Sequence, residues 1–291
     1  MEKEKIQKKI AEIERAMSSA EFWADKDRAQ ATILEHETLK NKLAGVGKYD
    51  SGDAVMTIFS GAGGDDAEDF SNMLLTMYLK YVSKIGWTFY LIHENKNDHG
   101  GYRNVTIEIR GKNAYGILKN ESGVHRLVRI SPFNAGKKRH TSFSMVEVVP
   151  KFEKAGEIKI PETDLRFELS RAGGPGGQNV NKRETAVRVV HIPTNLSAHV
   201  TSERSQAQNK EKAIAILTGK LYKRIEEERL AKEKGMYVSK TTQIEWGNQI
   251  RSYVLHPYKM VKDHRTSVEV HDVGNVLDGD LGIFLEAEKN L

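Results

Sequence analysis

The sequence predicts an α+β multidomain protein with an N-terminal helical hairpin, a mixed α/β domain, and a small α+β domain that carries a glycine loop and a long helix. Three observations predict this class. Apolar residues recur at helical spacing through residues 1–44, and from residue 54 short strand-like runs alternate with a helical stretch. After Pro161, further strand-like runs flank a glycine-rich stretch and precede a helical pattern of about 25 residues.

The N-terminal segment has the pattern of amphipathic helices. Ile6, Ile10, Ile13 and Met17 recur at helical spacing, and the pattern breaks at two serines before it resumes more loosely. We therefore expect two helices in a hairpin. Glycines at positions 45, 47 and 52 indicate a linker, so the first domain is predicted to cover residues 1–47.

The second domain alternates between strand and helix signals. Acidic residues in the first turn favour a helix over residues 65–84, because they suit the positive end of the helix dipole. Strands are expected at residues 54–59, 88–93, 105–109 and 146–149. We assign this domain residues 48–160 together with the closing segment, residues 252–291.

The third domain, residues 161–251, has strands predicted on both sides of its glycine loop. These strands are expected at residues 165–169, 186–191 and 196–201. The long helix that follows has one apolar stripe, which we expect to pack on the small sheet. The stripe is formed by Ile214, Leu217, Leu221 and Ile225.

Composition excludes several classes of protein. None of the 291 residues is cysteine, which rules out disulfides, thiolate metal sites and cysteine nucleophiles. The N-terminus is charged from its second residue, and no apolar run approaches the roughly 20 residues of a membrane span. The net charge is +5 and the sequence pI is about 9.1. We expect a cytoplasmic monomer that uses no membrane, metal or cofactor.

The stretch RAGGPGGQNVNK, residues 171–182, fits neither common phosphate-binding template. A P-loop needs a lysine and a hydroxyl directly after its last glycine, and a dinucleotide fingerprint needs a third glycine where Asn179 stands. Paired glycines give the backbone conformations closed to other residues, while Gln178 supplies an N–H and a carboxamide that could stabilise an oxyanion or hold a water. The neighbouring cations favour RNA as the target. A mobile surface hairpin tip is the alternative.

This glycine loop, followed by AVRVVHIPT, SERSQ and a long basic helix, resembles the hydrolysis domain of the class I peptide chain release factors. The resemblance implies that Gly176, Gly177 and Gln178 enter the ribosomal peptidyl transferase centre. There the backbone N–H of Gln178 would stabilise charge on the ester, and its side chain would position water. Such a protein is not a free-standing enzyme, because ribosomal RNA supplies the rest of the site. The family also implies N5-methylation of Gln178 by a glutamine methyltransferase.

A second basic stretch, HRLVRISPFNAGKKRHTSF at residues 125–143, contains no acid. Cations beside hydroxyls, histidines and a phenylalanine suit RNA contact, and a solvated basic loop is the alternative. The stretch resembles the codon-reading segment of bacterial release factor 2. The resemblance implies that Ser131, Pro132 and Phe133 form the specificity tripeptide for UAA and UGA, in which the serine hydroxyl can read A or G at the second position. The codon-binding set then extends to Arg139, to His140 as a stacking residue, and to Thr141 as the third-base contact.

The first base is read in this family from a helix N-terminus, matched here by GAGGDDAEDF at residues 61–70. The resemblance assigns this contact to the backbone near Gly63 and to the carboxylate of Asp66. Most relatives have glutamate there, so the side chain is one methylene shorter in this chain. Helix capping is the alternative role of Asp65 and Asp66.

The closing third, from TQIEWGNQIRSYVLHPYKM to VLDGDL, resembles the same family. It implies a switch segment that includes Trp246, Gln249 and Arg251, although a lone tryptophan is more often a core residue. The N-terminal helical domain is about half the usual length, and one helical hairpin of the family is missing. The sequence therefore does not support an interaction with the recycling GTPase.

The function that these resemblances imply is translation termination at UAA and UGA. The expected partners are the decoding centre of the small ribosomal subunit, the peptidyl transferase centre, the mRNA stop codon and peptidyl-tRNA. Two alternatives stay open. One is a codon-independent ribosome-rescue hydrolase, which the non-basic C-terminus LGIFLEAEKNL disfavours. The other is a nonenzymatic RNA-binding protein.

Overall fold

The computed structural model divides the chain into two compact units, Met1–Ser51 and Gly52–Leu291. Each unit is described by itself. The structure describes residues 2–18, 29–30, 32–33, 36, 39, 49–152, 160–171, 184–233, 248–289 and 291.

The first unit contains helix α1, Glu2–Met17. Ile10 and Ile13 are buried, as the spacing of apolar residues predicted. The Oε1 atom of Glu14 lies 3.0 Å from Nε2 of His36, which is itself helical. Most of the second predicted helix falls outside the described residues.

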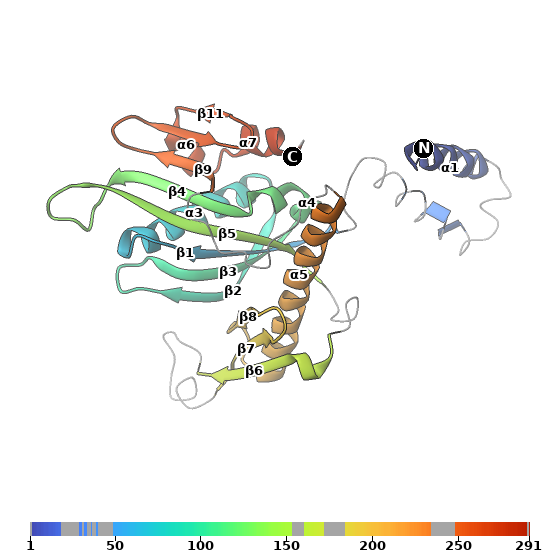
Figure 1. Ribbon diagram of the computed structural model, residues 1–291, viewed down its shortest axis with the longest axis horizontal. Helices are drawn as coiled ribbons and strands as arrows, with labels where there is room; N and C mark the ends of the chain where they lie inside the picture. Colours follow the sequence, from blue (N-terminus) through green and yellow to red (C-terminus); the bar gives the residue numbers. More distant parts are fainter. Residues whose placement is uncertain are drawn as a thin grey trace. The chain divides into compact units, whose positions relative to one another are not determined.

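The second unit is built on an eight-stranded sheet with the order β11-β10-β9-β4-β5-β1-β3-β2 (Figure 1). All neighbouring strands are antiparallel except β4 and β9, which are parallel. The strands are β1 Ala54–Ser60, β2 Thr88–Lys96, β3 Tyr102–Arg110, β4 Gly123–Ile130, β5 Arg139–Pro150, β9 Gln249–Val254, β10 Met260–Asp263 and β11 Glu269–Val270.

Helix α3, Asp65–Lys84, packs against β1, β3 and β5 and has the predicted bounds. Its buried face includes Phe70, Leu74 and Tyr78, which recur every four residues, as an amphipathic helix requires. The turn before the helix needs glycine at position 63. The φ angle of Gly63 is +136°, and a Cβ there would lie 3.0 Å from the Ser142 hydroxyl oxygen.

Short helices complete this part of the unit. They are α4 Ala114–Leu118, followed by the 3₁₀ turn Lys119–Glu121, and the C-terminal helices α6 Val273–Leu277 and α7 Gly282–Glu288. Strand β9 begins at Gln249, so the predicted domain boundary after residue 251 falls inside this strand. The reason is its pairing with β4, which places Arg251 opposite His125 in the large sheet.

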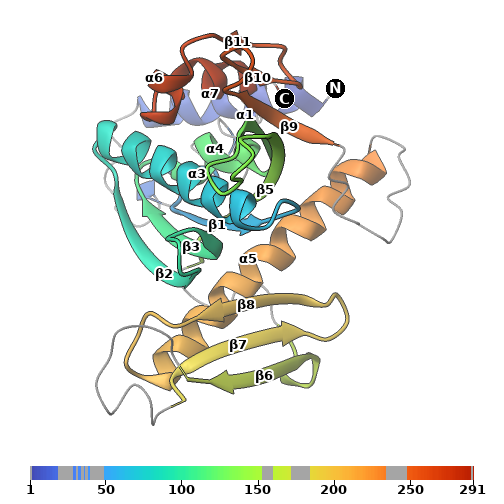
Figure 2. The ribbon, with the colours of Figure 1, turned by 90° about the vertical axis from the view of Figure 1, so that its left-hand side faces the viewer.

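A second sheet has three antiparallel strands in the order β6-β7-β8. These are β6 Leu165–Ser170, β7 Ala186–His191 and β8 Leu196–Val200. The long helix α5, Gln206–Glu233, packs along β7 and β8 (Figure 2). Leu217 and Leu221 of its predicted stripe are buried, but Ile225 is 53% exposed.

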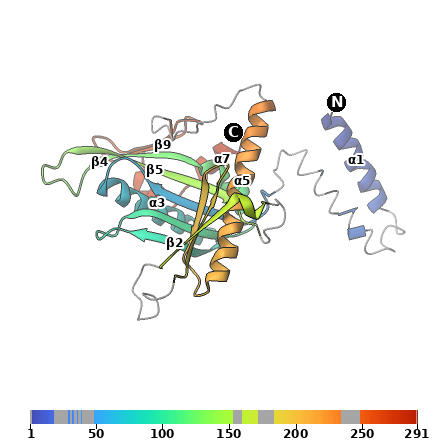
Figure 3. The ribbon, with the colours of Figure 1, turned by 60° about the horizontal axis from the view of Figure 1, so that its bottom comes forward.

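The small sheet and α5 share one core with the large sheet. Val55, Ile92 and Val149 of the large sheet belong to the same buried cluster as Leu217. Helix α5 also passes the end of β5, where the view in Figure 3 shows both elements.

Strands of the two sheets also meet through a pair of histidines, because the rings of His93 on β2 and His199 on β8 lie 4.2 Å apart. None of the helices in the described ranges combines the length and apolar content that a membrane crossing needs.

Candidate functional site

The candidate site lies where β4 and β5 meet in a hairpin, whose tip is formed by residues 131–138 and extends past its neighbours in Figure 1. The strands stay in register to their ends, with Ile130 opposite Arg139. The Ser131 amide then donates to the Lys138 carbonyl at 3.1 Å. This pairing closes the tip and places Phe133 at its exposed end, with 41% of its surface accessible.

Asp66, in the first turn of α3, is the centre of the site. Its Oδ2 accepts a hydrogen bond from the Ser131 hydroxyl at 2.6 Å and lies 2.9 Å from Nδ1 of His140. Its Oδ1 accepts from Nη2 of Arg129 at 3.1 Å. One carboxylate therefore joins both ends of the predicted reading segment to the helix N-terminus.

The Asp66 carboxylate is 5% exposed and ionised. Burial alone would raise the pKa of this carboxyl, but the hydrogen bonds from Ser131 and its other donors outweigh that effect and hold the pKa below its usual value. The alternative role in helix capping is not seen, because no side chain caps this N-terminus and Gly64 occupies the cap position. The contacts of Asp66 are instead with Ser131, His140 and Arg129.

Sequence reasoning missed a second acid in this cluster. Nη2 of Arg129 lies 2.6 Å from Oδ2 of Asp69, and its Nη1 lies 3.5 Å from the Met73 sulfur. Asp66, Asp69 and Met73 follow one another at spacings of three and four, so they share a face of α3. That spacing is the signal that could have identified them.

The tautomer of His140 follows from its neighbours. The Asn134 side chain accepts from the Gly136 amide through Oδ1 at 2.8 Å, which turns its amide nitrogen toward Nε2 of His140 at 3.0 Å. Because Asn134 donates to Nε2, Nδ1 is the ring nitrogen that donates to Asp66. The ring is thereby held in one orientation, with 38% of the side chain exposed.

The remaining predicted codon-binding residues form an open surface. Pro132, Arg139, Thr141 and Gly63 are all exposed, whereas Ser131 is only 2% exposed. The Ser131 hydroxyl also accepts from the Phe133 amide at 3.2 Å. The structure thus brings Ser131, His140 and Asp66 together behind a surface that faces solvent.

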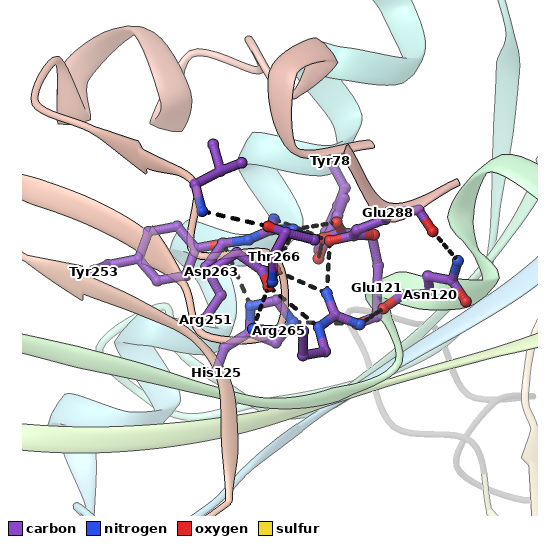
Figure 4. A network of polar contacts seen from close by, with 11 residues as sticks. Tyr78, Asn120, Glu121, His125, Arg251, Tyr253, Asp263, Arg265, Thr266 and Glu288 are labelled. Atoms are coloured by element: carbon purple, nitrogen blue, oxygen red, sulfur yellow. Dashed lines mark hydrogen bonds and ion pairs between the residues drawn. The ribbon is translucent and has the colours of Figure 1, made fainter. Parts of the chain in front are cut away.

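A second charged cluster surrounds Arg251 of β9 (Figure 4). Arg251 is completely buried and makes a bidentate contact with Glu121 at 2.9 and 2.6 Å. Its Nη2 also lies 2.5 Å from Glu288 and 3.3 Å from Asp263. Arg265 joins the same two acids at 2.6 and 2.8 Å. This cluster fastens α7 and β10 to the core.

Two cations and three acids meet in this cluster, and one proton balances the charge. Burial and the neighbouring Glu121 carboxylate raise the pKa of Glu288 to about 8, so this acid is protonated at neutral pH. The Oε2 atom of Glu288 has no hydrogen-bond partner within the described part of the chain, and it is therefore free to carry the proton.

His125 lies beside this cluster. It is fully buried, with Nε2 3.2 Å from the Glu121 carbonyl and Nδ1 3.3 Å from the Tyr253 hydroxyl. Burial lowers the pKa of His125 to about 4, so the ring is neutral. These contacts give His125 no face toward the candidate site.

The predicted hydrolysis residues Gly176, Gly177 and Gln178 lie outside the described residues, and so does Trp246. Gln249 and Arg251 of the predicted switch segment lie in β9, paired with β4. Within the described ranges, no group of three or more histidine and acidic side chains is arranged to hold a metal ion.

Comparisons with known proteins give consistent matches. Residues 36–146 match the PCRF domain family, and residues 153–265 match the RF-1 domain family. Peptide chain release factor 2 of Thermotoga petrophila is 48% identical over 255 residues, which cover 88% of this chain and 68% of that protein. Peptide chain release factor 2 of Clostridium perfringens is 47% identical over 262 residues, with 90% and 72% covered.

A solved structure has the same fold. RF2 of Thermus thermophilus matches with a TM-score of 0.72 and 39% sequence identity, and the match covers 98% of this chain and 80% of that chain. The fold and the sequence matches agree with the resemblance that the glycine loop and the reading segment predicted. The chain therefore belongs to the family of peptide chain release factor 2, a class I release factor of translation termination.

Proposed function

We propose that this chain recognises UAA and UGA in the ribosomal A site and promotes hydrolysis of the peptidyl-tRNA ester. The observation that carries the proposal is the Asp66 cluster, which holds the Ser131 hydroxyl and the His140 ring at the base of one exposed loop. A reading site needs such preorganised groups, because each would otherwise lose conformational freedom when the codon binds.

The hydrogen bonds of Ser131 suggest how one hydroxyl accepts two purines. Adenine offers an amine donor at N6, and guanine offers an acceptor at O6. The hydroxyl has two acceptor lone pairs, of which the Phe133 amide uses one, so the second can accept from adenine. For guanine, the hydroxyl must turn its proton from Asp66 to O6. Asp66 stays compensated during this turn, because His140 and Arg129 remain bonded to it.

The burial of Ser131 adds a requirement. At 2% exposure the hydroxyl can meet a base only after a local rearrangement that uncovers it. The exposed Phe133 and Thr141 would then flank the codon, with the His140 ring available for stacking. Codon reading in this proposal therefore includes a local rearrangement at Ser131.

Hydrolysis is assigned to the glycine loop through the sequence. Gly176 and Gly177 would let the backbone enter the peptidyl transferase centre, and Gln178 would donate its N–H to the oxyanion. Peptidyl-tRNA and ribosomal RNA are the partners at that end, so the chain is not a free-standing enzyme. N5-methylation of Gln178 by a glutamine methyltransferase is part of the same proposal.

The test is peptide release from ribosomes that hold a labelled peptidyl-tRNA and carry UAA, UGA, UAG or a sense codon in the A site. We expect fast release on UAA and UGA alone. Ser131→Ala should reduce release about tenfold on UGA and less on UAA, because alanine removes the donor that guanine needs. Ser83→Ala, on the exposed C-terminal part of α3, is the matched control and should leave release unchanged.

Gln178→Ala separates the alternatives. We expect it to abolish release while binding to stop-codon ribosomes persists. Release by the unaltered chain on every codon, or only with an empty A site, would instead identify a rescue hydrolase. A Gln178→Ala chain with full activity would mean that the protein acts by RNA binding alone.

A further inference from the structure

A second hairpin tip lies beside the reading loop. Residues 97–101 join β2 to β3, and the ring of His99 lies 6.0 Å from the ring of Phe133, centroid to centroid, at an interplanar angle of 45°. Both side chains are exposed. The two rings come from different hairpins, so their contact is made by the fold and not by neighbouring positions in the sequence.

The backbone around His99 is held in place by Asn97. The side-chain oxygen of Asn97 accepts from the His99 amide at 3.0 Å and from the Gly101 amide at 2.7 Å. The backbone N–H of Asn97 donates in turn to the Gly101 carbonyl at 2.9 Å. These three hydrogen bonds fix the point from which the imidazole projects.

The same tip is seated on helix α3. A Cβ at Gly101 would lie 2.7 Å from the carbonyl carbon of Glu68 and 2.9 Å from the amide nitrogen of Asp69, so the two backbones touch. Arg103 adds a hydrogen bond from Nε to Oε1 of Glu68 at 3.2 Å. One turn of α3 therefore supports both the hairpin tip and the Asp66 cluster.

Phe133 connects this tip to the reading hydroxyl. Its amide donates to the Ser131 oxygen at 3.2 Å and occupies one of the two acceptor positions there. A displacement of Phe133 would change which lone pair of Ser131 is available to a base. The position of the Phe133 ring is therefore coupled to the hydrogen-bonding state of the loop.

We propose that His99 is a positioning residue of codon recognition, whose ring fixes the Phe133 ring and thereby the conformation of residues 131–133. The inference rests on the proposed function. A contact between two exposed rings has a modest free energy, so its loss should change apparent codon affinity about three- to tenfold.

The first experiment separates binding from chemistry. His99→Ala should raise the concentration for half-maximal release on UAA and UGA about three- to tenfold and leave the maximal rate unchanged. His99→Phe keeps a ring and should restore the value of the unaltered chain. Asp98→Ala, one exposed residue away, is the matched control and should have no effect. A His99→Phe chain as weak as His99→Ala would overturn the proposal.

A double-mutant cycle tests whether His99 acts through Phe133. In a Phe133→Ala background, His99→Ala should have no further effect, because the ring that it positions is gone. If the two effects multiply instead, His99 acts on something else, such as RNA, and the proposal fails. Unchanged thermal unfolding of each variant would exclude a loss of folded protein.

One measurement on the free protein keeps this inference separate from the proposed function. With ¹⁹F-labelled phenylalanine, His99→Ala should shift the Phe133 resonance, which a Phe133→Leu chain would assign. An unshifted resonance would overturn the ring contact whatever the ribosome assays show. Failure of the unaltered chain on every stop codon, with the shift present, would refute the proposed function and the role of His99 in recognition but leave the contact itself established.

Discussion

The Arg251 and Asp66 clusters are built from the same chemical groups in opposite surroundings. Around Arg251, the guanidinium and two acids are fully buried, and their partners lie in the same core. The Asp66 carboxylate is also nearly buried, at 5%, but the side chains that it holds reach outward. His140 is 38% exposed, and Phe133, which is bonded to Ser131, is 41% exposed.

This difference distinguishes a structural ion cluster from the recognition site that we propose. A buried ion pair is weak evidence of function, because its groups satisfy one another and offer nothing to a ligand. In the Asp66 cluster, one carboxylate orients Ser131 and His140, and part of the His140 side chain stays exposed to solvent. Exposure of the residues that a buried charge orients therefore indicates function better than a shifted pKa alone.

Removal of Arg251 is the strongest test of the structural side of this comparison. Arg251→Met removes both guanidinium contacts of the buried Glu121, while Asp263 keeps Arg265, and we expect a loss of about 3–5 kcal/mol in the free energy of unfolding. Urea unfolding at pH 7 measures it. Release per folded molecule should stay normal. Arg265→Met is the matched control with a smaller loss, because its side chain is 24% exposed and water can replace it.

The local part of the fold was predictable from the sequence, and the cluster geometry was not. The spacing of apolar residues and the first-turn acids identified helix α3 with its observed bounds, because these signals lie within 20 residues. Asp66 meets Ser131 and His140 through long-range pairing. Strand β1, which leads into α3, pairs with β5 as far as Ser60 opposite Ser144, and this brings the start of α3 to the β4–β5 hairpin. The family resemblance identified these three residues individually, but no sequence spacing predicted that they contact one another.

The Arg251 cluster was missed for a similar reason. Its members lie between residues 121 and 288, and each is an ordinary charged residue in its own segment. Arg251 was instead assigned to a switch segment by resemblance, and the structure gives it a completely buried position. Burial of an arginine on a short strand depends on which acids the other strands and helices bring to it. That information is absent from any local pattern.

The charge balance within the Arg251 cluster predicts a dependence of stability on pH. The pKa of Glu288 is raised to about 8 from an ordinary value of 4.5, so between these values the folded chain keeps a proton that the unfolded chain releases. Stability from this group is complete below pH 4.5 and is lost as pH rises through 8. Between pH 6.5 and 8 we expect a decline of about 2 kcal/mol in the free energy of unfolding.

Glu288→Gln tests this assignment, because glutamine imitates the protonated acid. The variant should be nearly as stable as the unaltered chain at pH 6.5 and should lack the decline toward pH 8. Burial lowers the pKa of both His125 and His93 to about 4, so each raises stability by roughly 0.4 kcal/mol between pH 6.5 and 8, in the opposite direction to Glu288 and equally in the variant and the unaltered chain. A decline that persists in Glu288→Gln would show that another group carries the proton.

Within this comparison, the smaller effect on stability should come with the larger effect on function. Asp66→Asn keeps the shape of the side chain but removes its charge and one acceptor oxygen, so one of its three donors loses its partner. Arg129 keeps its ion pair with Asp69, and the exposed His140 ring can form a hydrogen bond with water instead. We therefore expect a loss of only about 1–2 kcal/mol in the free energy of unfolding. Release on UAA and UGA should nevertheless fall about tenfold, because a neutral amide binds the donors Ser131 and His140 more weakly than the carboxylate does and holds them less firmly in place. Asp65→Asn, exposed on the same turn, should change neither quantity. If Asp66→Asn is as destabilising as Arg251→Met and releases peptide normally, the two clusters are both structural and the distinction drawn between them is wrong.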